Sequence, residues 1–380
     1  MKFSQVKYQD PATKTYLGSP SIIRLDDGSL LATHDYFGPG CPRNYENEEH
    51  LTSVYRSSDE GESWINVTHV ANAYWSSLFK HKGDIYLFGI SQQYGSIVIR
   101  RSEDNGNTWT HPKDESTGLL FRGGYFHDPP NYHTAPVPIL KAKSRLYRAF
   151  EDCTPCIWGT GFQSFVISAD EDSNLLDSAN WTMSNKLPFK KEWTPEEWGE
   201  VKAPGWLEGN VIEAPNGEIW NILRVNSDPA VDKAAIVKVS DNGKNTTFDP
   251  VTGFIDFPGG MTKFTIRRDP ITRLYLTLSN NNTVTSWASQ RNVLSLHVSE
   301  DLIHWHHKKT LLEDNQNLPL EESLRFTGFQ YVDWQFDGEN IIYLVRTAYD
   351  KAHNFHDANR VTSWKLNDFR KIIHFLLTRE

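Results

Sequence analysis

One polar turn occurs twice in the chain with nearly the same sequence. Residues 56–64 read RSSDEGESW and residues 101–109 read RSEDNGNTW, and each copy follows a short β-branched or aromatic run. In the shared pattern SxDxGxxW, Ser and Asp hold a tight turn through side-chain hydrogen bonds, and Gly supplies a permissive backbone dihedral. The Trp is expected to pack beneath the adjoining hairpin. The turn is a structural motif, and its repetition indicates a fold built from repeated β units.

Hairpins also recur along the chain. Six segments combine an apolar strand, a tight turn and a second strand: SIIRLDDGSLLATHDYF, SLFKHKGDIYLFGI, PVPILKAKSRLYRAFE, NVIEAPNGEIWNILRV, KFTIRRDPITRLYLTLSN and FQYVDWQFDGENIIYLVR. A hairpin followed by a further strand and turn gives a four-stranded unit, with almost no helical pattern between copies. Radial repetition of that unit predicts an all-β fold, a β-propeller with six legible blades.

The two ends of the chain are expected to pair with each other and so to close the ring of blades. We expect the N-terminal KFSQVKYQ to pair with the C-terminal VTSWKL and RKIIHFLL, which would complete a seventh blade or tie the ring shut. In this interpretation residues 1–380 form a single propeller domain.

Composition excludes some classes of partner. The net charge is −9 and no run of Lys and Arg would follow a phosphate backbone, so nucleic acid is not expected as a partner. No segment reaches the roughly 20 apolar residues of a membrane helix, and no signal peptide is visible. We therefore expect a cytoplasmic monomer with no membrane association, or a secreted protein if a leader has been removed.

The chain has three cysteines, and two of them form the segment CTPC at residues 153–156. Such a pair can be a redox motif or half of a zinc site. Without a second CxxC or a thioredoxin-like context, we expect reduced, structural thiols and neither a cofactor nor a metal in the active site, although a structural cation stays open.

Polar residues recur near the start of the hairpins and at the end of their second strands, the positions that face the central funnel of a propeller. Arg and Glu are rarely buried without partners, so this repetition predicts a polar pocket, with a network of structural salt bridges as the alternative. The candidates are His34, Asn72, Gln92, Gln93, Tyr132, His133, Arg148, Glu208, Asn210, Arg224, Lys263, Tyr331 and Arg346.

Two segments resemble sialidase blades. EGNVIEAPNGEIWNILR is similar to the blade in which a Glu opens the inner strand and an Arg closes the next, and TGFQYVDWQFDGENIIYLVR is similar to the blade with the tyrosine nucleophile. The sialidase FRIP signature is replaced by residues 18–21, GSPS. The arginine that would clamp the substrate carboxylate is missing there, which argues against true sialidase activity.

A closer resemblance is to sialidase-like propellers that act on uronate-containing glycans, namely rhamnosyl-glucuronate lyases, related α-L-rhamnosidases and, more distantly, ulvan lyases. It is carried by SPSIIRLDDGSLLATHDYFG, YWSSLF, NYHTAPVPILKAKSRLYRAFED, WLEGN and HDAN. The resemblance implies seven blades and the Asp-box name for the repeated turn. It also implies active-site roles for Tyr132 and Arg148, whereas the second-blade histidines of the lyases are replaced by Asn72 and Gln92 or Gln93.

The residue types fit two reaction classes. A lyase must neutralise the uronate carboxylate, for which Arg148, Arg224 and Lys263 are candidates, and must move protons at C5 and O4. Tyr132 or His133 could move those protons.

A hydrolase needs paired carboxylates, a Tyr with a Glu, or a lone histidine. Glu208 with Tyr331 is the candidate pair, and His34 is the candidate lone histidine. Structural roles stay open for Tyr132 as a packing ring, for Arg148 as a brace for Glu151, and for His34 as a loop partner of Asp35.

Taken together, the sequence predicts an enzyme that acts on terminal rhamnose linked to glucuronate, by β-elimination. Hydrolysis by an α-L-rhamnosidase or another sialidase-like glycoside hydrolase is the alternative reaction. A propeller that binds glycans without catalysis is the alternative from another functional class.

Overall fold

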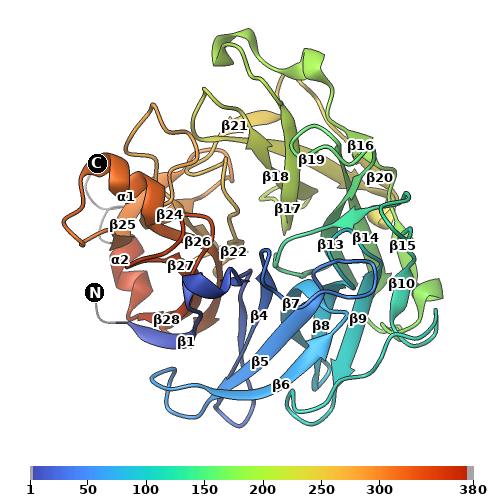
Figure 1. Cartoon of the computed structure of the whole chain (residues 1–380). Coiled ribbons are helices and arrows are strands. Elements are labelled where there is room, and N and C mark those ends of the chain that lie inside the picture. The colour runs from blue at the N-terminus through green and yellow to red at the C-terminus, as the bar shows by residue number, and fades with distance from the viewer. Residues whose placement is uncertain (1–2, 375–380) are drawn as a thin grey trace.

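The computed structural model describes residues 3–374 and contains six antiparallel β-sheets arranged around a central axis (Figure 1). The fold is therefore an all-β, six-bladed propeller. The six blades legible in the sequence are confirmed, and the seventh blade implied by the resemblance is wrong.

The first three blades follow one another along the chain. Blade 1 contains β2 (Tyr16–Leu17), β3 (Ser21–Arg24), β4 (Leu30–Phe37), β5 (Leu51–Ser57) and β6 (Ile65–Ala71). Blade 2 contains β7 (Tyr74–His81), β8 (Asp84–Ile90), β9 (Ile97–Ser102) and β10 (Leu119–Phe121). Blade 3 contains β11 (Tyr132–His133), β12 (Leu140–Ala142), β13 (Arg145–Cys153), β14 (Phe162–Asp170), β15 (Trp181–Met183) and β16 (Leu187–Pro188).

The other three blades complete the ring. Blade 4 contains β17 (Gly205–Glu213), β18 (Ile219–Asn226), β19 (Lys233–Ser240), β20 (Asn245–Thr247) and β21 (Phe254–Asp256). Blade 5 contains β22 (Ile266–Arg268), β23 (Tyr275–Asn280), β24 (Val293–Ser299) and β25 (His306–Glu313). Blade 6 contains β26 (Gly328–Asp337), β27 (Asn340–Ala348), β28 (Arg360–Leu366) and β1 (Ser4–Tyr8).

Blade 6 is built from both ends of the chain. Strand β1 pairs antiparallel with β28, so Ser4 lies opposite Ser363 and Tyr8 opposite Arg360. The second C-terminal segment expected to form a strand, RKIIHFLL, contributes instead to the short helix α2 (Phe369–His374), and its last residues lie outside the described part of the chain. A second short helix, α1 (Leu320–Phe326), precedes β26.

The core lies between neighbouring blades, and this explains the continuous apolar runs in the strands. Strand β8 of blade 2 is buried on both faces because its sheet packs against another sheet on each side. Between blades 2 and 3, for example, the ring of Phe88 lies 5.7 Å from that of Phe150. Equivalent clusters join blade 1 to blade 2 and blade 6 to blade 1.

The repeated turns have the expected hydrogen bonds. In the first, the Ser57 hydroxyl donates to Asp59 at 2.8 Å, the Gly61 amide donates to Ser57 at 2.9 Å, and the Trp64 indole donates to the Gly61 carbonyl at 3.2 Å. Trp64 and Trp109 are only half-buried, and each packs against the core cluster beside its blade. The expected packing of the Trp against the adjoining hairpin is therefore confirmed.

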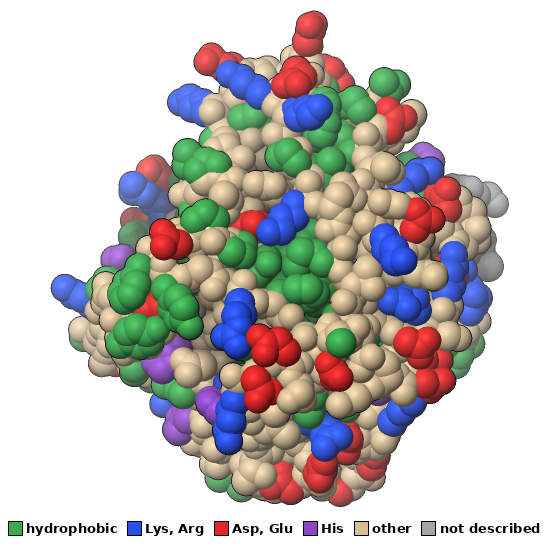
Figure 2. Space-filling view, turned by 90° about the vertical axis from the view of Figure 1, so that its right-hand side faces the viewer, with side chains coloured by type: hydrophobic (Ala, Val, Ile, Leu, Met, Phe, Trp, Pro, Cys, Tyr) green, Lys and Arg blue, Asp and Glu red, His purple; other side chains and the backbone are tan. Residues whose placement is uncertain are grey.

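Acidic and basic side chains are interspersed over the flank of the propeller shown in Figure 2. In the described part of the chain, no helix is long and apolar enough to span a membrane.

Candidate functional site

A cavity of about 270 Å³ lies where the six blades meet, and every blade contributes to its wall. Two carboxylates and three arginines are among the lining side chains. The cavity is lined by Gly18, Phe37, Glu49, Tyr74, Trp75, Gln93, Tyr94, His133, Trp158, Leu207, Glu208, Arg224, Arg291, Tyr331, Arg346 and His356.

Three of these residues lie in β-bulges, which direct their side chains into the cavity. The first strands of blades 2, 4 and 6 each contain an irregularity in register, at residues 74–77, 207–210 and 330–333. Within these bulges Trp75, Glu208 and Tyr331 have positive φ angles of 43°, 56° and 52°. A bulge re-aims a side chain, and strained backbone of this kind clusters at functional sites. The strands are therefore built to point these three side chains inward.

Tyr331, Glu208 and Arg224 form a buried hydrogen-bonded group. The Tyr331 hydroxyl donates to Glu208 Oε1 at 2.7 Å, and Arg224 Nη1 donates to Glu208 Oε2 at 2.8 Å. Burial raises the pKa of Glu208, but the Arg224 charge and the two hydrogen bonds outweigh it, so the net pKa lies below the ordinary value. Burial and the Glu208 charge raise the pKa of Tyr331. The shared proton therefore resides on the tyrosine.

Arg291 and Arg346 flank the same tyrosine. Their guanidinium carbons lie 5.9 and 4.7 Å from the centre of the Tyr331 ring. Arg291 donates to the Gln330 side chain and Arg346 to the His356 carbonyl, and the buried Nε atoms of both lack a partner within residues 3–374. Neither arginine forms a direct ion pair with a carboxylate in that range, so both guanidinium groups are available to an anionic ligand.

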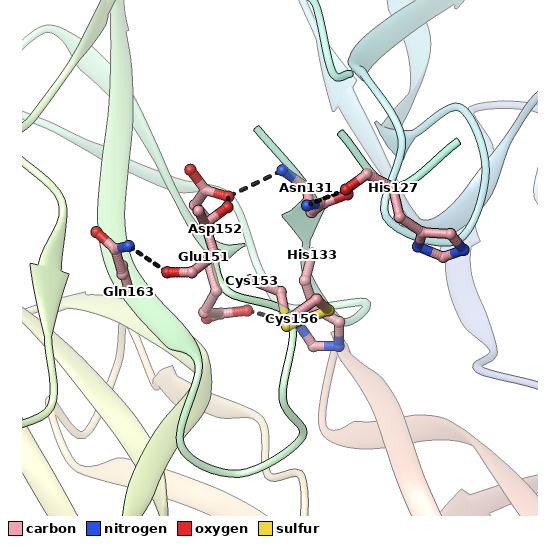
Figure 3. The surroundings of a disulfide bond; sticks show 9 residues. His127, Asn131, His133, Glu151, Asp152, Cys153, Cys156 and Gln163 are labelled. Carbon is pink, nitrogen blue, oxygen red and sulfur yellow. Dashed lines mark hydrogen bonds and ion pairs between the residues drawn. A yellow bond between two sulfur atoms is a disulfide. The ribbon is translucent and has the colours of Figure 1, made fainter. Parts of the chain in front are cut away.

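Glu49 and His133 occupy other parts of the wall. Glu49 accepts hydrogen bonds from the Tyr74 hydroxyl at 2.6 Å and from Arg43 at 3.0 Å. His133 Nδ1 lies 2.8 Å from Glu151, which is fully buried behind it, and Figure 3 shows this pair beside the disulfide. The carboxylate fixes the orientation of the imidazole, so that Nε2 is the ring nitrogen left for other contacts.

Several sequence-predicted site residues do line the cavity: Gln93, His133, Glu208, Arg224, Tyr331 and Arg346. The others lie elsewhere. Asn72 is exposed in a turn, Gln92 accepts a hydrogen bond from Asn44, and His34 is buried against the Tyr55 ring. These three residues do not line the cavity, and their role in substrate binding stays a prediction.

The predicted catalytic residues Tyr132 and Arg148 also lie outside the cavity wall. Tyr132 packs against Phe165 in the core between blades 2 and 3. Arg148 is fully buried, and its guanidinium donates to the carbonyls of Phe88, Trp75 and Ala135. These positions are those expected from the structural alternatives, and a catalytic role for either residue stays a prediction. For Arg148 the bonded partners are backbone carbonyls, whereas the sequence had suggested Glu151.

Lys263 and Asn210 are likewise internal structural groups. The Lys263 ammonium donates to Thr265 at 2.6 Å and to the Val332 carbonyl at 2.7 Å. Asn210 accepts from the Ile266 amide at 2.9 Å and so ties blade 4 to blade 5. Neither residue lines the cavity, because their polar groups are used in joining blades.

Sequence reasoning missed Arg291, Glu49 and Trp158. Arg291 precedes the third strand of blade 5, a position that the search of hairpin starts and ends did not cover. Glu49 and Trp158 lie in loops whose course no repeat predicts. His356 belongs to the HDAN segment that carried part of the resemblance, and it lines the cavity.

The CTPC segment forms a disulfide, so the expectation of reduced thiols is wrong for this pair. Cys153 ends β13 and bonds to Cys156, whereas Cys41 is a buried free thiol. Figure 3 places the disulfide next to His133 and Glu151. Residues 3–374 contain no group of three or more His, Cys, Asp or Glu residues arranged to hold a metal ion.

Comparisons with known proteins give the fold. No family model and no curated protein matches the sequence. A Penicillium chrysogenum α-L-arabinanase complexed with arabinobiose is 15% identical, with a TM-score of 0.59 over 97% of this chain and 98% of that one.

Two sialidase-type structures are also similar. The Trypanosoma rangeli sialidase is 14% identical, with a TM-score of 0.58 over 95% of this chain and 56% of that one. The intramolecular trans-sialidase from Ruminococcus gnavus, in complex with oseltamivir carboxylate, is 13% identical, with a TM-score of 0.54 over 96% and 97%. At these identities the likeness establishes a shared propeller fold.

Proposed function

We propose that this chain is a glycoside hydrolase that acts on a sugar bearing a carboxylate, with Tyr331 as nucleophile and Glu208 as its base. The observation that carries the proposal is the 2.7 Å hydrogen bond between these two side chains in a cavity that also holds three arginines. Neighbours of the same fold include an arabinanase and sialidases, which supports action on a glycan.

The arginines determine the class of sugar. Arg224 is already paired with Glu208, but Arg291 and Arg346 have no carboxylate partner in the described chain. A buried cation without a counterion is costly, so an anionic ligand group is favoured there. A carboxylate fits because guanidinium groups bind it with directed, charge-assisted hydrogen bonds. The GSPS segment of blade 1 lacks the arginine with which sialidases bind the substrate carboxylate. Arg346 of blade 6 offers a guanidinium group in the same cavity.

The tyrosine explains how a nucleophile can work beside this carboxylate. A carboxylate nucleophile would be repelled by the substrate anion, whereas the Tyr331 hydroxyl is neutral at rest. As its oxygen bonds to the anomeric carbon and the bond to the leaving oxygen breaks, Glu208 accepts the phenolic proton. His133, which lines the cavity, can protonate the leaving oxygen through Nε2. Water then attacks the anomeric carbon of the glycosyl-tyrosine and gives one proton back to His133, while Glu208 returns its proton to the Tyr331 oxygen.

A second candidate is β-elimination from a uronate within a rhamnosyl-glucuronate glycan. The observation in its favour is His133, which faces the cavity and is oriented by Glu151, so its free nitrogen could remove the C5 proton. The same arginines would stabilise the charge on the carboxylate.

A panel of substrates distinguishes hydrolysis from β-elimination. The protein is given sialosides, glucuronides, neutral arabinofuranosides and rhamnosyl-glucuronate oligosaccharides, and the products are followed by released sugar and by ultraviolet absorbance. Release of an acidic sugar without absorbance supports the hydrolase. Absorbance of a C4=C5 unsaturated uronate would replace it with the lyase. Binding of an acidic glycan without any product would leave a glycan-binding role, and turnover of neutral glycosides alone would contradict the assignment of the arginines.

A further inference from the structure

The central cavity continues into a second hollow of about 510 Å³. The two share four lining residues, Trp158, Arg224, Arg291 and His356. Beyond this shared wall the second hollow is bounded by Asn226, Asp228, Met261, Trp287 and Phe355, which come from blades 4 and 6 and from the loops next to blade 5. A ligand in the cavity can therefore extend into the hollow past the two arginines.

Trp287 is one of the aromatic residues that line this hollow. The loop that carries it is well fixed, because Gln290 Oε1 accepts from the amides of Thr283 and Val284 at 2.8 and 2.9 Å. The ring of Trp287 therefore offers the hollow a flat apolar face in a fixed position.

Trp158 stands on the shared wall, and its loop is held at both ends. The Cys153–Cys156 disulfide closes the base of the loop, and the Thr154 amide donates to the Gly161 carbonyl at 3.1 Å. Near the tip, Gly159 packs so closely on Gly205 that a Cβ at Gly205 would lie 1.5 Å from the Gly159 carbonyl oxygen. The side chain of Trp158 is nevertheless 56% exposed. A large aromatic ring held rigidly at a rim is suited to stack on a ligand with little entropic cost.

We propose that this hollow binds a second sugar of the same glycan, so that the natural substrate is an oligosaccharide contacted by Trp158 and Trp287. The occupant is a sugar because the hollow joins flat aromatic rings to the polar side chains of Asn226, Asp228 and Ser286, a combination that suits a ring with apolar faces and hydroxyl edges. This inference rests on the proposed function for the sugar in the central cavity.

The test measures affinity in a background that does not turn substrate over. Calorimetry on Tyr331→Phe protein compares the free acids N-acetylneuraminate and glucuronate with the oligosaccharides 3′-sialyllactose and rhamnosyl-glucuronosyl-galactose. Trp287→Ala and Trp158→Ala are added to this background. The control is Ile157→Ala, which removes an exposed apolar side chain from the same loop outside both hollows.

We expect Trp287→Ala to weaken oligosaccharide binding about five- to tenfold, to leave monosaccharide binding within about twofold, and the control to change neither. Trp158→Ala, on the wall shared with the central cavity, should weaken oligosaccharide binding at least as much. Equal losses for both ligand lengths in Trp287→Ala, or no loss, would overturn the second subsite even if the wild-type enzyme hydrolyses acidic glycosides. A selective loss in a protein that hydrolyses none of them would support the subsite and overturn the proposed reaction. Absence of binding by any probe would overturn both.

Discussion

The hydroxyl oxygen of Tyr331 lies 2.7 Å from Oε1 of Glu208, although 123 residues separate the two in the chain. The contact joins blades 4 and 6, which are not neighbours in the ring, so it exists only because the blades close around one axis. Both residues lie in β-bulges with positive φ, which costs conformational energy that a purely structural hydrogen bond would not need.

Replacing Tyr331 by Phe removes the proposed nucleophilic oxygen and keeps the ring. We expect kcat to fall by at least about 10³-fold, because no other oxygen occupies its position. Initial rates on the best acidic glycoside of the panel measure this, and the affinity for that glycoside should change little.

The matched control is Tyr132→Phe, which removes a hydroxyl from a tyrosine in the core between blades. Its turnover should stay within about twofold of wild type, whereas Glu208→Gln should be nearly as inactive as Tyr331→Phe. The reverse order, with Tyr132 essential and Glu208 dispensable, would restore the lyase interpretation made from the sequence.

Glu208 also links stability to pH. Its pKa in the folded protein lies below the ordinary value of 4.5, because the Arg224 pairing and the hydrogen bonds outweigh the effect of burial. As the pH falls, the unfolded chain therefore takes up this proton first. The stabilisation is present above pH 4.5 and is lost as the pH falls through the lower pKa of the folded state.

Glu208→Gln should lower the free energy of unfolding at pH 7 by about 3 kcal/mol, since Arg224 loses its counterion. It should also flatten the decline of stability in acid. Urea unfolding between pH 7 and pH 3 measures both effects. A variant curve parallel to that of wild type would show that the pair does not carry this linkage.

The repeat predicted the fold because its signals are local. Turn hydrogen bonds and apolar strands need only neighbouring residues. Residues 299–305, SEDLIHW, form a related turn that is one residue shorter: Ser299 donates to Asp301 and accepts from the amide of Leu302, which has a φ of 70°. Burial of each blade between two others makes the strands apolar on both faces. These features are readable without any knowledge of the ring.

The site was only partly predictable, as Arg148 and Arg346 illustrate. Both lie in the second strand of a hairpin, in LYRAFE and YLVRTA, and the sequences give no reason to separate them. Arg346 is near the end of β27 and lines the cavity. Arg148 is in the middle of β13 between the rings of Phe88 and Phe150. Which of the two arginines reaches the cavity depends on its position along the strand and on how the neighbouring blade packs against it. Neither can be read from the residues next to it in the sequence.

Arg148→Met tests the structural role. The apolar chain is kept, but three buried carbonyl groups lose their donor, so we expect a loss of about 3–5 kcal/mol in the free energy of unfolding. kcat of the folded fraction should stay near wild type. Arg122→Met, at an exposed position, is the control and should change stability by less than about 0.5 kcal/mol. Unchanged melting with a loss of turnover by orders of magnitude would mean that Arg148 acts on the substrate after all.

His34 provides the last prediction, because burial lowers its pKa to about 4 against an ordinary 6.5, despite an opposing hydrogen bond to the Asp35 carbonyl. The carbonyl can only accept, so Nδ1 carries the proton and the ring is neutral. Between pH 6.5 and 4 the unfolded chain binds a proton that the folded protein does not, so stability falls as the pH falls through this window, by roughly 3 kcal/mol in total. His34→Gln cannot titrate and should lower stability at pH 7 but give a flatter curve over the same range, with activity on acidic glycosides retained. Chemical denaturation at half-unit pH steps measures the two slopes. Equal slopes would show that His34 does not cause the pH dependence of stability. A stable but inactive variant would show that His34 contacts the substrate, which would contradict its buried position against Tyr55.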